Sequence, residues 1–352
     1  MSIFKKLQNS CIQKLNQLLS NLRLQPKMST TSKIIVLIGF QASTKSSAAK
    51  EIHENTPNSV ILSRDTEGGT IERLVAKAEA KLNDGKVVIL DNTNLTKQTR
   101  KQFIDLANRL KVPIEAQYFK TTIEDCQIRH LRRMYDKFGE IYQTGTNQNV
   151  KKDPHCFGSV VLFKARKDLE EPAKDEGFNS ITVCQVPSPI WDSSFKNKAL
   201  FLDIDGTIRK TDHLPNKYPV NPDEVELLHS VNLMNQVLSK YTSQGYKLIG
   251  LSNQSGIAKG TLTKESADAT FEKTRALLGY TAEEFPILYC PHRPAPITCF
   301  CRKPQTGMAM ECIMKYKLDP RDCIMVGDMK TDEEMARRLS MKYIDVKAFW
   351  KF

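Results

Sequence analysis

The sequence predicts two α/β domains, each built around a parallel β-sheet. Its 352 residues exceed what one hydrophobic core usually organises, so two domains are expected. Short apolar runs alternate with segments of helical composition in each half of the chain, a pattern typical of parallel α/β folds. Residues 187–198 hold prolines and small polar residues between the two alternations, and we interpret them as a linker.

The apolar runs give the expected strands of each domain. In the first domain, residues 33–186, we expect strands at 33–39, 59–62, 87–90 and 114–119. In the second domain, residues 199–352, we expect strands at 199–204, 247–251 and 323–326. Consecutive parallel strands need crossover connections, and the intervening segments are long enough to supply them as helices. We detect no internal repeat between the halves.

Residues 1–32 precede the first domain as a basic, acid-free extension. Apolar residues recur in it at roughly helical spacing. These features suit either a mitochondrial targeting segment or a basic helix that packs on the body or on a partner, and Met28 offers a second start. We expect a nuclear or mitochondrial location, or both, with the cytoplasm as the alternative.

The net charge of +12 suggests an anionic partner such as nucleic acid. Eight lysines and arginines lie within residues 1–50, which leaves a net charge of only +4 for the other residues. Charge alone therefore does not establish that partner. No uncharged apolar run approaches the roughly 20 residues of a membrane-spanning helix, so no membrane association is expected.

A phosphate-binding loop is predicted after the first strand. Residues 39–46 read GFQASTKS, which matches GxxxxGK[ST] except that Thr44 stands at the second glycine position. Backbone N–H groups between Gly39 and Thr44 would cradle the phosphates of ATP, Lys45 would neutralise the β and γ oxygens, and the Ser46 hydroxyl would bind Mg²⁺. Because threonine adopts positive φ reluctantly, an ordinary strand-to-helix turn is the alternative.

Polar blocks also follow the second and third expected strands. Arg64 and Asp65 follow the second strand, and Asp91 and Asn92 follow the third. Ligands bind at this edge of open α/β sheets. An aspartate there can accept the proton of an attacking hydroxyl, and a downstream arginine cluster can cover the transferred phosphoryl group. That cluster comprises Arg129, Arg132 and Arg133. For each of these residues a solvated surface position is the alternative.

Together with an Arg-His pair at 129–130 and the EGF sequence at 176–178, these blocks resemble the kinase domain of bifunctional polynucleotide kinase/3'-phosphatases. The resemblance covers residues 34–186 and implies a P-loop kinase fold. It implies that Asp65 is the general base that activates a 5'-hydroxyl and that Arg133 is a lid arginine that contacts the nucleotide. The implied contacts to phosphate, Mg²⁺ and substrate are Lys45, Ser46, Arg64, Asp91 and Asn92.

Two aspartates, Asp203 and Asp205, follow the first strand of the second domain and precede a glycine. Asp203 would attack phosphorus and become an aspartyl phosphate, and Asp205 would protonate the leaving oxygen and later deprotonate water. Mg²⁺ would offset the repulsion between carboxylate and phosphate. A hairpin turn, in which Asp-Gly is common, is the alternative.

Three later blocks favour the catalytic interpretation. Ser252 and Asn253 could hydrogen-bond a phosphoryl group, Lys303 supplies a cation, and Asp328 offers a hard oxygen ligand. The order of these blocks resembles the haloacid-dehalogenase phosphatases, which implies a HAD-like, Rossmannoid parallel sheet. The implied Mg²⁺ ligands of this domain are Asp203, Asp205 and Asp328.

Nine cysteines are present, and three of them lie within twelve residues beside a histidine. Three thiolates and one imidazole form the ligand set of a structural Zn²⁺ site, and the predicted ligands are Cys290, His292, Cys299 and Cys301. Scattered buried thiols are the alternative. With the neighbouring NQSGI and RKP sequences, this loop resembles the zinc-bearing branch that includes histidinol phosphatase and heptose bisphosphate phosphatase.

The two resemblances predict an enzyme that uses ATP, Mg²⁺ and structural Zn²⁺ to convert 5'-hydroxyl and 3'-phosphate ends of nucleic acid into ligatable ends. DNA is favoured over RNA, and repair proteins are candidate partners. Two alternatives stay open. One is a phosphatase whose kinase domain only binds nucleic acid, because Ala42 and Thr44 stand where the family has glycines. The other is a small-molecule kinase fused to a sugar-phosphate phosphatase.

Overall fold

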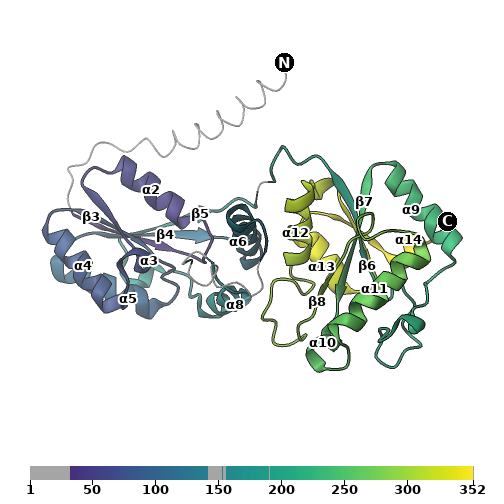
Figure 1. Ribbon diagram of the computed structural model, residues 1–352. Coiled ribbons are helices and arrows are strands. Elements are labelled where there is room, and N and C mark those ends of the chain that lie inside the picture. Colours follow the sequence, from purple (N-terminus) through teal and green to yellow (C-terminus); the bar gives the residue numbers. More distant parts are fainter. Residues whose placement is uncertain (1–31, 142–152, 154–155, 190, 352) are drawn as a thin grey trace, which may run out of the picture.

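The computed structural model describes residues 32–141, 153, 156–189 and 191–351. The predicted extension at 1–32, with Met28, therefore lies almost entirely outside the described residues. Two five-stranded parallel sheets are present, one in each half of the chain (Figure 1). The α/β fold class expected for both halves is thus confirmed. Among the described residues, none of the helices combines the length and the apolar character needed to cross a membrane.

The first sheet has the strand order β2-β3-β1-β4-β5. Its strands are β1 (Ile34–Ile38), β2 (Ser59–Leu62), β3 (Val87–Asp91), β4 (Ile114–Lys120) and β5 (Ser180–Gln185). Its helices are α2 (Lys45–Asn55), α3 (Arg64–Glu67), α4 (Ile71–Asn83), α5 (Lys97–Leu110), α6 (Ile123–Phe138) and α8 (Ser159–Asp168), with a 3-10 turn η1 (Lys174–Glu176). Four strands lie where the sequence predicts them, and β5 is additional.

Both faces of the first sheet are covered because alternate residues of its strands are apolar on both sides. On one face, Ile35 and Leu37 of β1 pack against α2. On the other face, Ile34 and Val36 pack against α4 and α5. The strands therefore hold their polar carboxyl ends at one common edge.

The second sheet has the order β10-β9-β6-β7-β8. Its strands are β6 (Lys198–Asp203), β7 (Tyr246–Asn253), β8 (Ile287–Cys290), β9 (Ile324–Gly327) and β10 (Lys342–Asp345). Its helices are α9 (Val231–Ser243), α10 (Ser255–Lys259), α11 (Lys264–Leu278), α12 (Gly307–Tyr316), α13 (Lys330–Arg338) and α14 (Val346–Phe349), with 3-10 turns η2 (Pro222–Glu224) and η3 (Pro320–Asp322). Strands β8 and β10 are additional to the prediction.

Helices α9, α11 and α14 cover one face of the second sheet, and α12 and α13 cover the other. Helix α6 of the first half packs against α12, as Figure 1 shows between the two sheets. Leu131 and Met134 of α6 belong to the same buried apolar cluster as Phe201 of β6 and Met308 of α12. The two halves therefore share part of one hydrophobic core.

Candidate active sites

One cavity of about 660 Å³ opens at the carboxyl edge of the first sheet. Its lining combines the loop after β1, the turn after β2, the loop after β3 and a part of α6, which this strand order brings together. The predicted site residues that line it are Lys45, Ser46, Arg64, Asp65, Asp91, Asn92 and Arg133. Gly39 and Thr44 belong to the same loop but do not line the cavity.

The loop between β1 and α2 keeps glycine-type backbone angles at both positions where glycine is replaced. Ala42 has a φ of 58° and Thr44 has a φ of 71°. Residues with a Cβ rarely adopt this left-handed region, which costs them about 1–2 kcal/mol each. Thr44 precedes α2 as its N-cap, and its side chain makes no capping hydrogen bond. The loop therefore adopts these angles at the expense of backbone strain.

Lys45 begins α2 and is buried inside the loop. Its Nζ donates hydrogen bonds to the carbonyl oxygens of Gly39 at 3.0 Å and Phe40 at 2.5 Å. Burial lowers the pKa of Lys45 to about 8, and the nearby carboxylate of Asp91 opposes that shift. A phosphate in the cavity would favour the charged ammonium, so the site is suited to an anionic ligand.

Asp65 lies on the one-turn helix α3 and is exposed at the cavity. Two hydrogen bonds fix the turn that carries it: the Asp65 N–H donates to Ser63 Oγ at 3.1 Å, and the Arg64 N–H donates to Asn92 Oδ1 at 2.9 Å. The Asn92 Nδ2 group is buried and has no hydrogen-bond partner among the described residues. Asn92 thus positions the predicted base and retains one donor in the cavity lining.

Of the three clustered arginines on α6, only Arg133 lines the cavity. Arg129 donates to the Pro187 carbonyl oxygen at 2.5 Å, and Arg132 pairs with Asp192 at 3.5 Å. The expectation that all three cover the transferred phosphoryl group is therefore corrected, because acceptors of the linker segment engage two of them.

Arg100 of α5 is a site residue that sequence reasoning missed. Its side chain is fully buried and pairs with Glu176 at 2.7 Å. It also donates to the carbonyl oxygens of Asn94 at 3.1 Å and Leu95 at 2.8 Å. The glutamate of the EGF sequence therefore anchors the loop after β3, and no local spacing signal connects two residues so distant in sequence.

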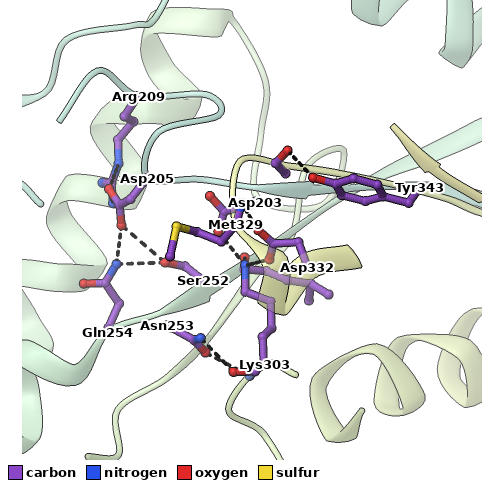
Figure 2. A network of polar contacts seen from close by, with 12 residues as sticks. Asp203, Asp205, Arg209, Ser252, Asn253, Gln254, Lys303, Met329, Asp332 and Tyr343 are labelled. Carbon is purple, nitrogen blue, oxygen red and sulfur yellow. Dashed lines mark hydrogen bonds and ion pairs between the residues drawn. The ribbon is translucent and has the colours of Figure 1, made fainter. Parts of the chain in front are cut away.

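A second site lies at the carboxyl end of β6 (Figure 2). Lys303 Nζ donates to Asp203 Oδ1 at 2.5 Å and pairs with Asp332 Oδ1 at 2.7 Å, and all three side chains are buried. Burial raises the pKa of Asp203 to about 8, opposed by Lys303 and reinforced by Asp332. Burial also disfavours the charge on Lys303, but the two carboxylates outweigh it and hold the pKa of Lys303 above its usual value.

The carboxylates of Asp203, Asp328 and Asp332 each offer an oxygen within 4.8 Å of the others. Asp203 Oδ2 is buried and has no hydrogen-bond partner among the described residues. Two glycines make room for the cluster, because a Cβ at Gly206 would collide with Asp328 and a Cβ at Gly327 would collide with Asp332. Three hard oxygen donors with one buried, unpartnered oxygen fit a Mg²⁺ ion.

The Asp205 carboxylate lies outside that cluster. Its Oδ1 accepts from Arg209 Nη2 at 2.7 Å, and its Oδ2 accepts from Gln254 Nε2 at 2.6 Å. These donors engage both oxygens of Asp205, and Asp332 is the residue that clusters with Asp203 and Asp328. The expected Mg²⁺ contact of Asp205 stays a prediction, and so does its acid–base role.

Ser252 and Asn253, both expected to bind phosphate, differ in what they contact. Ser252 Oγ donates to Asp205 Oδ2 at 3.3 Å and therefore lies beside the predicted acid. Asn253 instead brackets the backbone of Lys303: its Oδ1 accepts from the Lys303 N–H at 3.0 Å and its Nδ2 donates to the Lys303 carbonyl at 3.1 Å. Asn253 thus positions the lysine.

The four predicted zinc ligands converge after β8. The Sγ atoms of Cys290 and Cys299 lie 3.7 Å apart, and His292 Nδ1 lies 3.5 Å from Cys290 Sγ and 3.2 Å from Cys301 Sγ. Tetrahedral zinc with Zn–S bonds of about 2.3 Å separates its sulfurs by about 3.8 Å. The donor set and its spacing fit Zn²⁺, and Cys301 lies two residues before Lys303.

Comparisons with known proteins give a match in each half. Residues 198–347 match the family model for polynucleotide kinase 3 phosphatase, and residues 67–147 match a model described as an AAA domain. The second match begins after the phosphate loop. A Thermoplasma volcanium protein assigned as a D-glycero-D-manno-heptose-1,7-bisphosphate 7-phosphatase is 37% identical over 154 residues, which cover 42% of this chain and 96% of that protein.

Other similar proteins match either the second half of the chain or most of its length. The D-glycero-beta-D-manno-heptose-1,7-bisphosphate 7-phosphatase of Haemophilus influenzae is 34% identical over 39% of this chain and 73% of its own. The D,D-heptose 1,7-bisphosphate phosphatase structure from B. bronchiseptica has a TM-score of 0.36, 27% identity and coverage of 42% and 79%. The Pnkp1/Rnl/Hen1 complex has a TM-score of 0.31, 16% identity and coverage of 92% and 98%.

Proposed function

The chain belongs to the haloacid-dehalogenase-like phosphatases, joined to a P-loop kinase-type domain in the architecture of bifunctional polynucleotide kinase/phosphatases, and from this premise we propose that it repairs broken nucleic-acid ends. The kinase half phosphorylates 5'-hydroxyl ends with ATP, and the phosphatase half removes 3'-phosphates. One observation supports the proposal most directly: a single chain holds a phosphate-loop cavity in one half and an aspartate cluster with a buried lysine in the other. A kinase and a phosphatase at these two sites would together produce the ends that a ligase requires.

In the kinase half, the exposed carboxylate of Asp65 accepts the proton of the 5'-hydroxyl as that oxygen attacks the γ-phosphorus. Lys45 and Arg133 line the same cavity and supply positive charge to the phosphates. The Ser46 hydroxyl also lines the cavity and would hold Mg²⁺. An ion held there would supply charge that neutralises the phosphates.

In the phosphatase half, Asp203 attacks phosphorus and the phosphoryl group passes to its carboxylate. Lys303 lies within hydrogen-bond distance of Asp203 and neutralises the incoming phosphate. Asp205 protonates the departing 3'-oxygen and later takes a proton from the attacking water. The carboxylates of Asp203, Asp328 and Asp332 would hold Mg²⁺, which offsets their repulsion of the phosphate.

The backbone of the phosphate loop favours an active kinase over a domain that only binds nucleic acid. Ala42 and Thr44 keep positive φ angles, so the loop retains the conformation that two glycines would supply. Lys45 is also directed into the loop by hydrogen bonds to its carbonyls.

The test is a nicked duplex with a 5'-hydroxyl and a 3'-phosphate, incubated with the protein, ATP and Mg²⁺. We expect both ends to change on DNA, and an RNA duplex measured in parallel decides between the two polymers. Lys45→Ala should abolish only the 5'-phosphorylation, and Asp203→Asn should lower only the 3'-dephosphorylation, by at least about 10³-fold. Loss of the 3'-phosphate alone in the wild type would contradict the kinase assignment.

The heptose-bisphosphate phosphatase relatives favour a second candidate, removal of phosphate from a small sugar phosphate. A comparison of kcat/KM on two substrates distinguishes the two functions. If the protein is a sugar-phosphate phosphatase, heptose 1,7-bisphosphate should be hydrolysed with a higher kcat/KM than a 3'-phosphorylated oligonucleotide. The reverse order supports nucleic-acid repair.

A further inference from the structure

Arg209 is buried beside the predicted acid–base residue of the phosphatase site, and only 1% of it is exposed. It lies four residues after Asp205 in the same turn and pairs with it through two nitrogens. Nε lies 3.0 Å and Nη2 lies 2.7 Å from Asp205 Oδ1. Figure 2 shows Arg209 on one side of the carboxylate, with Ser252 and Gln254 on the other.

The guanidinium is itself held from α11. Its Nη1 donates to Thr270 Oγ1 at 3.0 Å, and its Cζ lies 4.8 Å from the centre of the Phe271 ring. The backbone closes the same turn, because the Arg209 N–H donates to the Ile204 carbonyl and the Gly206 N–H donates to the Arg209 carbonyl, both at 2.9 Å. Arg209 is thus fixed on three sides.

These contacts make the two oxygens of Asp205 different. Oδ1 carries both Arg209 contacts, whereas Oδ2 lies within hydrogen-bond distance of Gln254 Nε2 at 2.6 Å and Ser252 Oγ at 3.3 Å. Ser252 is the penultimate residue of β7, the strand next to the Asp203 strand β6. Oδ2, which contacts Ser252, is therefore the oxygen on the side of the reacting groups. Rotation of the carboxylate would break the paired guanidinium contact.

We propose that Arg209 is a positioning residue that fixes Asp205 so that Oδ2 delivers the proton to the leaving oxygen. The inference rests on the proposed phosphatase function. In the step, an Asp203 oxygen forms the new bond to phosphorus while the bond from phosphorus to the leaving oxygen breaks. The electron pair of that bond stays on the leaving oxygen, which takes the proton from Asp205 Oδ2. No other reactant is needed.

Substrates with different leaving groups distinguish a positioning role of Arg209 from a merely structural role. An alkyl phosphate releases a poor alkoxide and depends on the proton, whereas p-nitrophenyl phosphate releases a stable phenolate and depends on it little. The ratio kcat/KM reports the step in which the leaving group departs, before water attacks the phosphorylated enzyme. Arg209 should therefore matter more for alkyl substrates.

The experiment compares Arg209→Met and Arg209→Lys with the wild type on glycerol 2-phosphate, a 3'-phosphorylated oligonucleotide and p-nitrophenyl phosphate. Arg209→Met should lower kcat/KM for both alkyl substrates by a factor of about 10² or more. For the aryl substrate, the factor by which kcat/KM falls should be at least about tenfold smaller. Arg209→Lys, which keeps the charge but loses the paired contact, should fall between. Equal losses on all three substrates would overturn the proposal.

Two further variants keep the test decisive if Arg209→Met folds poorly. Thr270→Val removes one hydrogen-bond partner of the guanidinium. It should lower kcat/KM more for alkyl than for aryl substrates, but by smaller factors than Arg209→Met.

In an Asp205→Asn background, Arg209→Met should lower kcat/KM no further, since Arg209 acts through Asp205. A further loss there would contradict the proposal. Arg321→Met, which removes an exposed arginine that pairs with Asp319, is the matched control.

The design also separates this inference from the nucleic-acid assignment. If the wild type hydrolyses glycerol 2-phosphate but not the oligonucleotide, the repair function fails while the alkyl-to-aryl comparison still tests Arg209. If both alkyl substrates react and the loss is uniform in Arg209→Met, the repair function stands and the positioning role fails.

Discussion

At the phosphate loop, Thr44 holds a left-handed backbone with a β-branched side chain. Thr44→Gly should relieve about 1–2 kcal/mol of backbone strain in the folded protein. Glycine also gives the unfolded chain more conformational freedom, which offsets a smaller part of that gain. We expect the free energy of unfolding to rise by about 0.5–1 kcal/mol, measured by thermal unfolding, and ADP to bind more tightly, measured by calorimetry.

A matched position separates the two effects of Thr44→Gly. Lys111 follows α5 as its C-cap with a φ of 55°, and it does not line the cavity. Lys111→Gly should gain similar stability without changing ADP affinity. If ADP binding weakens in Thr44→Gly, strain in this loop does not limit nucleotide binding.

His130 predicts a pH dependence of stability. Burial lowers its pKa from the usual 6.5 to about 4, and its Nε2 lies 2.9 Å from the Phe157 carbonyl oxygen. The unfolded chain binds a proton below pH 6.5 that the folded chain takes up only near pH 4. The free energy of unfolding should therefore fall as the pH drops through this window, by about 3 kcal/mol from this group.

The contribution of His130 is isolated by His130→Phe, which removes the titration and retains a ring to stack on Phe157. Urea unfolding at several pH values between 4 and 7.5 gives the slope for each protein. The variant should lose less stability on acidification than the wild type. Equal slopes would mean that another group causes the loss of stability at low pH.

At the residue scale, the sequence predicted where short motifs lie relative to the strands, but it did not predict contacts between distant segments. The nucleotide-loop lysine and the paired aspartates stand in short motifs, so their place at strand ends follows from the sequence. Arg100 and Glu176 are 76 residues apart, and nothing in either neighbourhood marks their pairing. Arg209 follows a recognised motif, but its contact to Thr270 depends on α11.

Among the elements, the loop between β8 and α12 links the predicted zinc site to the phosphatase lysine. The Gln254 N–H donates to the Cys290 carbonyl at 2.8 Å, and Cys301 is followed two residues later by Lys303. Loss of the metal would release Cys301 and so misplace Lys303 relative to Asp203.

Zinc removal should therefore affect one activity selectively. Purified protein should contain about one Zn²⁺ per chain, and Cys301→Ser or a zinc chelator should lower 3'-dephosphorylation by about 10–100-fold. 5'-phosphorylation by the same samples is the internal control and should change much less. Full phosphatase activity in zinc-free protein would rule out this role for the loop.

The strands that prediction missed share a physical cause. Strands β5 and β10 are at sheet edges, and none of their residues is buried. These two edge strands lack the continuous apolar run that marked the central strands β1 and β6, and their pairing depends on a neighbour already in place. Strand β8 is also at an edge and has only four residues.

For the whole molecule, the contact between the two halves is the feature that separate domain predictions could not supply. Helix α6 reads as an amphipathic helix of the first half, yet Leu131 and Met134 join the apolar cluster that underlies the second sheet. His130 on the same helix lies 5.6 Å, centre to centre, from Phe300, which stands between two predicted zinc ligands. An exposed apolar stripe on α6 would be costly, so each half stabilises the other.

This shared core predicts that the two halves unfold together. The wild type should give one calorimetric transition, because opening either sheet exposes the apolar face of α6.

Leu131→Asp places a charge in the shared cluster, where Leu131 is fully buried, and should split unfolding into two transitions. Leu74→Ala removes buried apolar atoms from the first half alone, costs about 2–5 kcal/mol and should keep a single transition at lower temperature. Two transitions in the wild type would show that the interface is too weak to couple the domains, and the Leu131→Asp profile would then match the wild type.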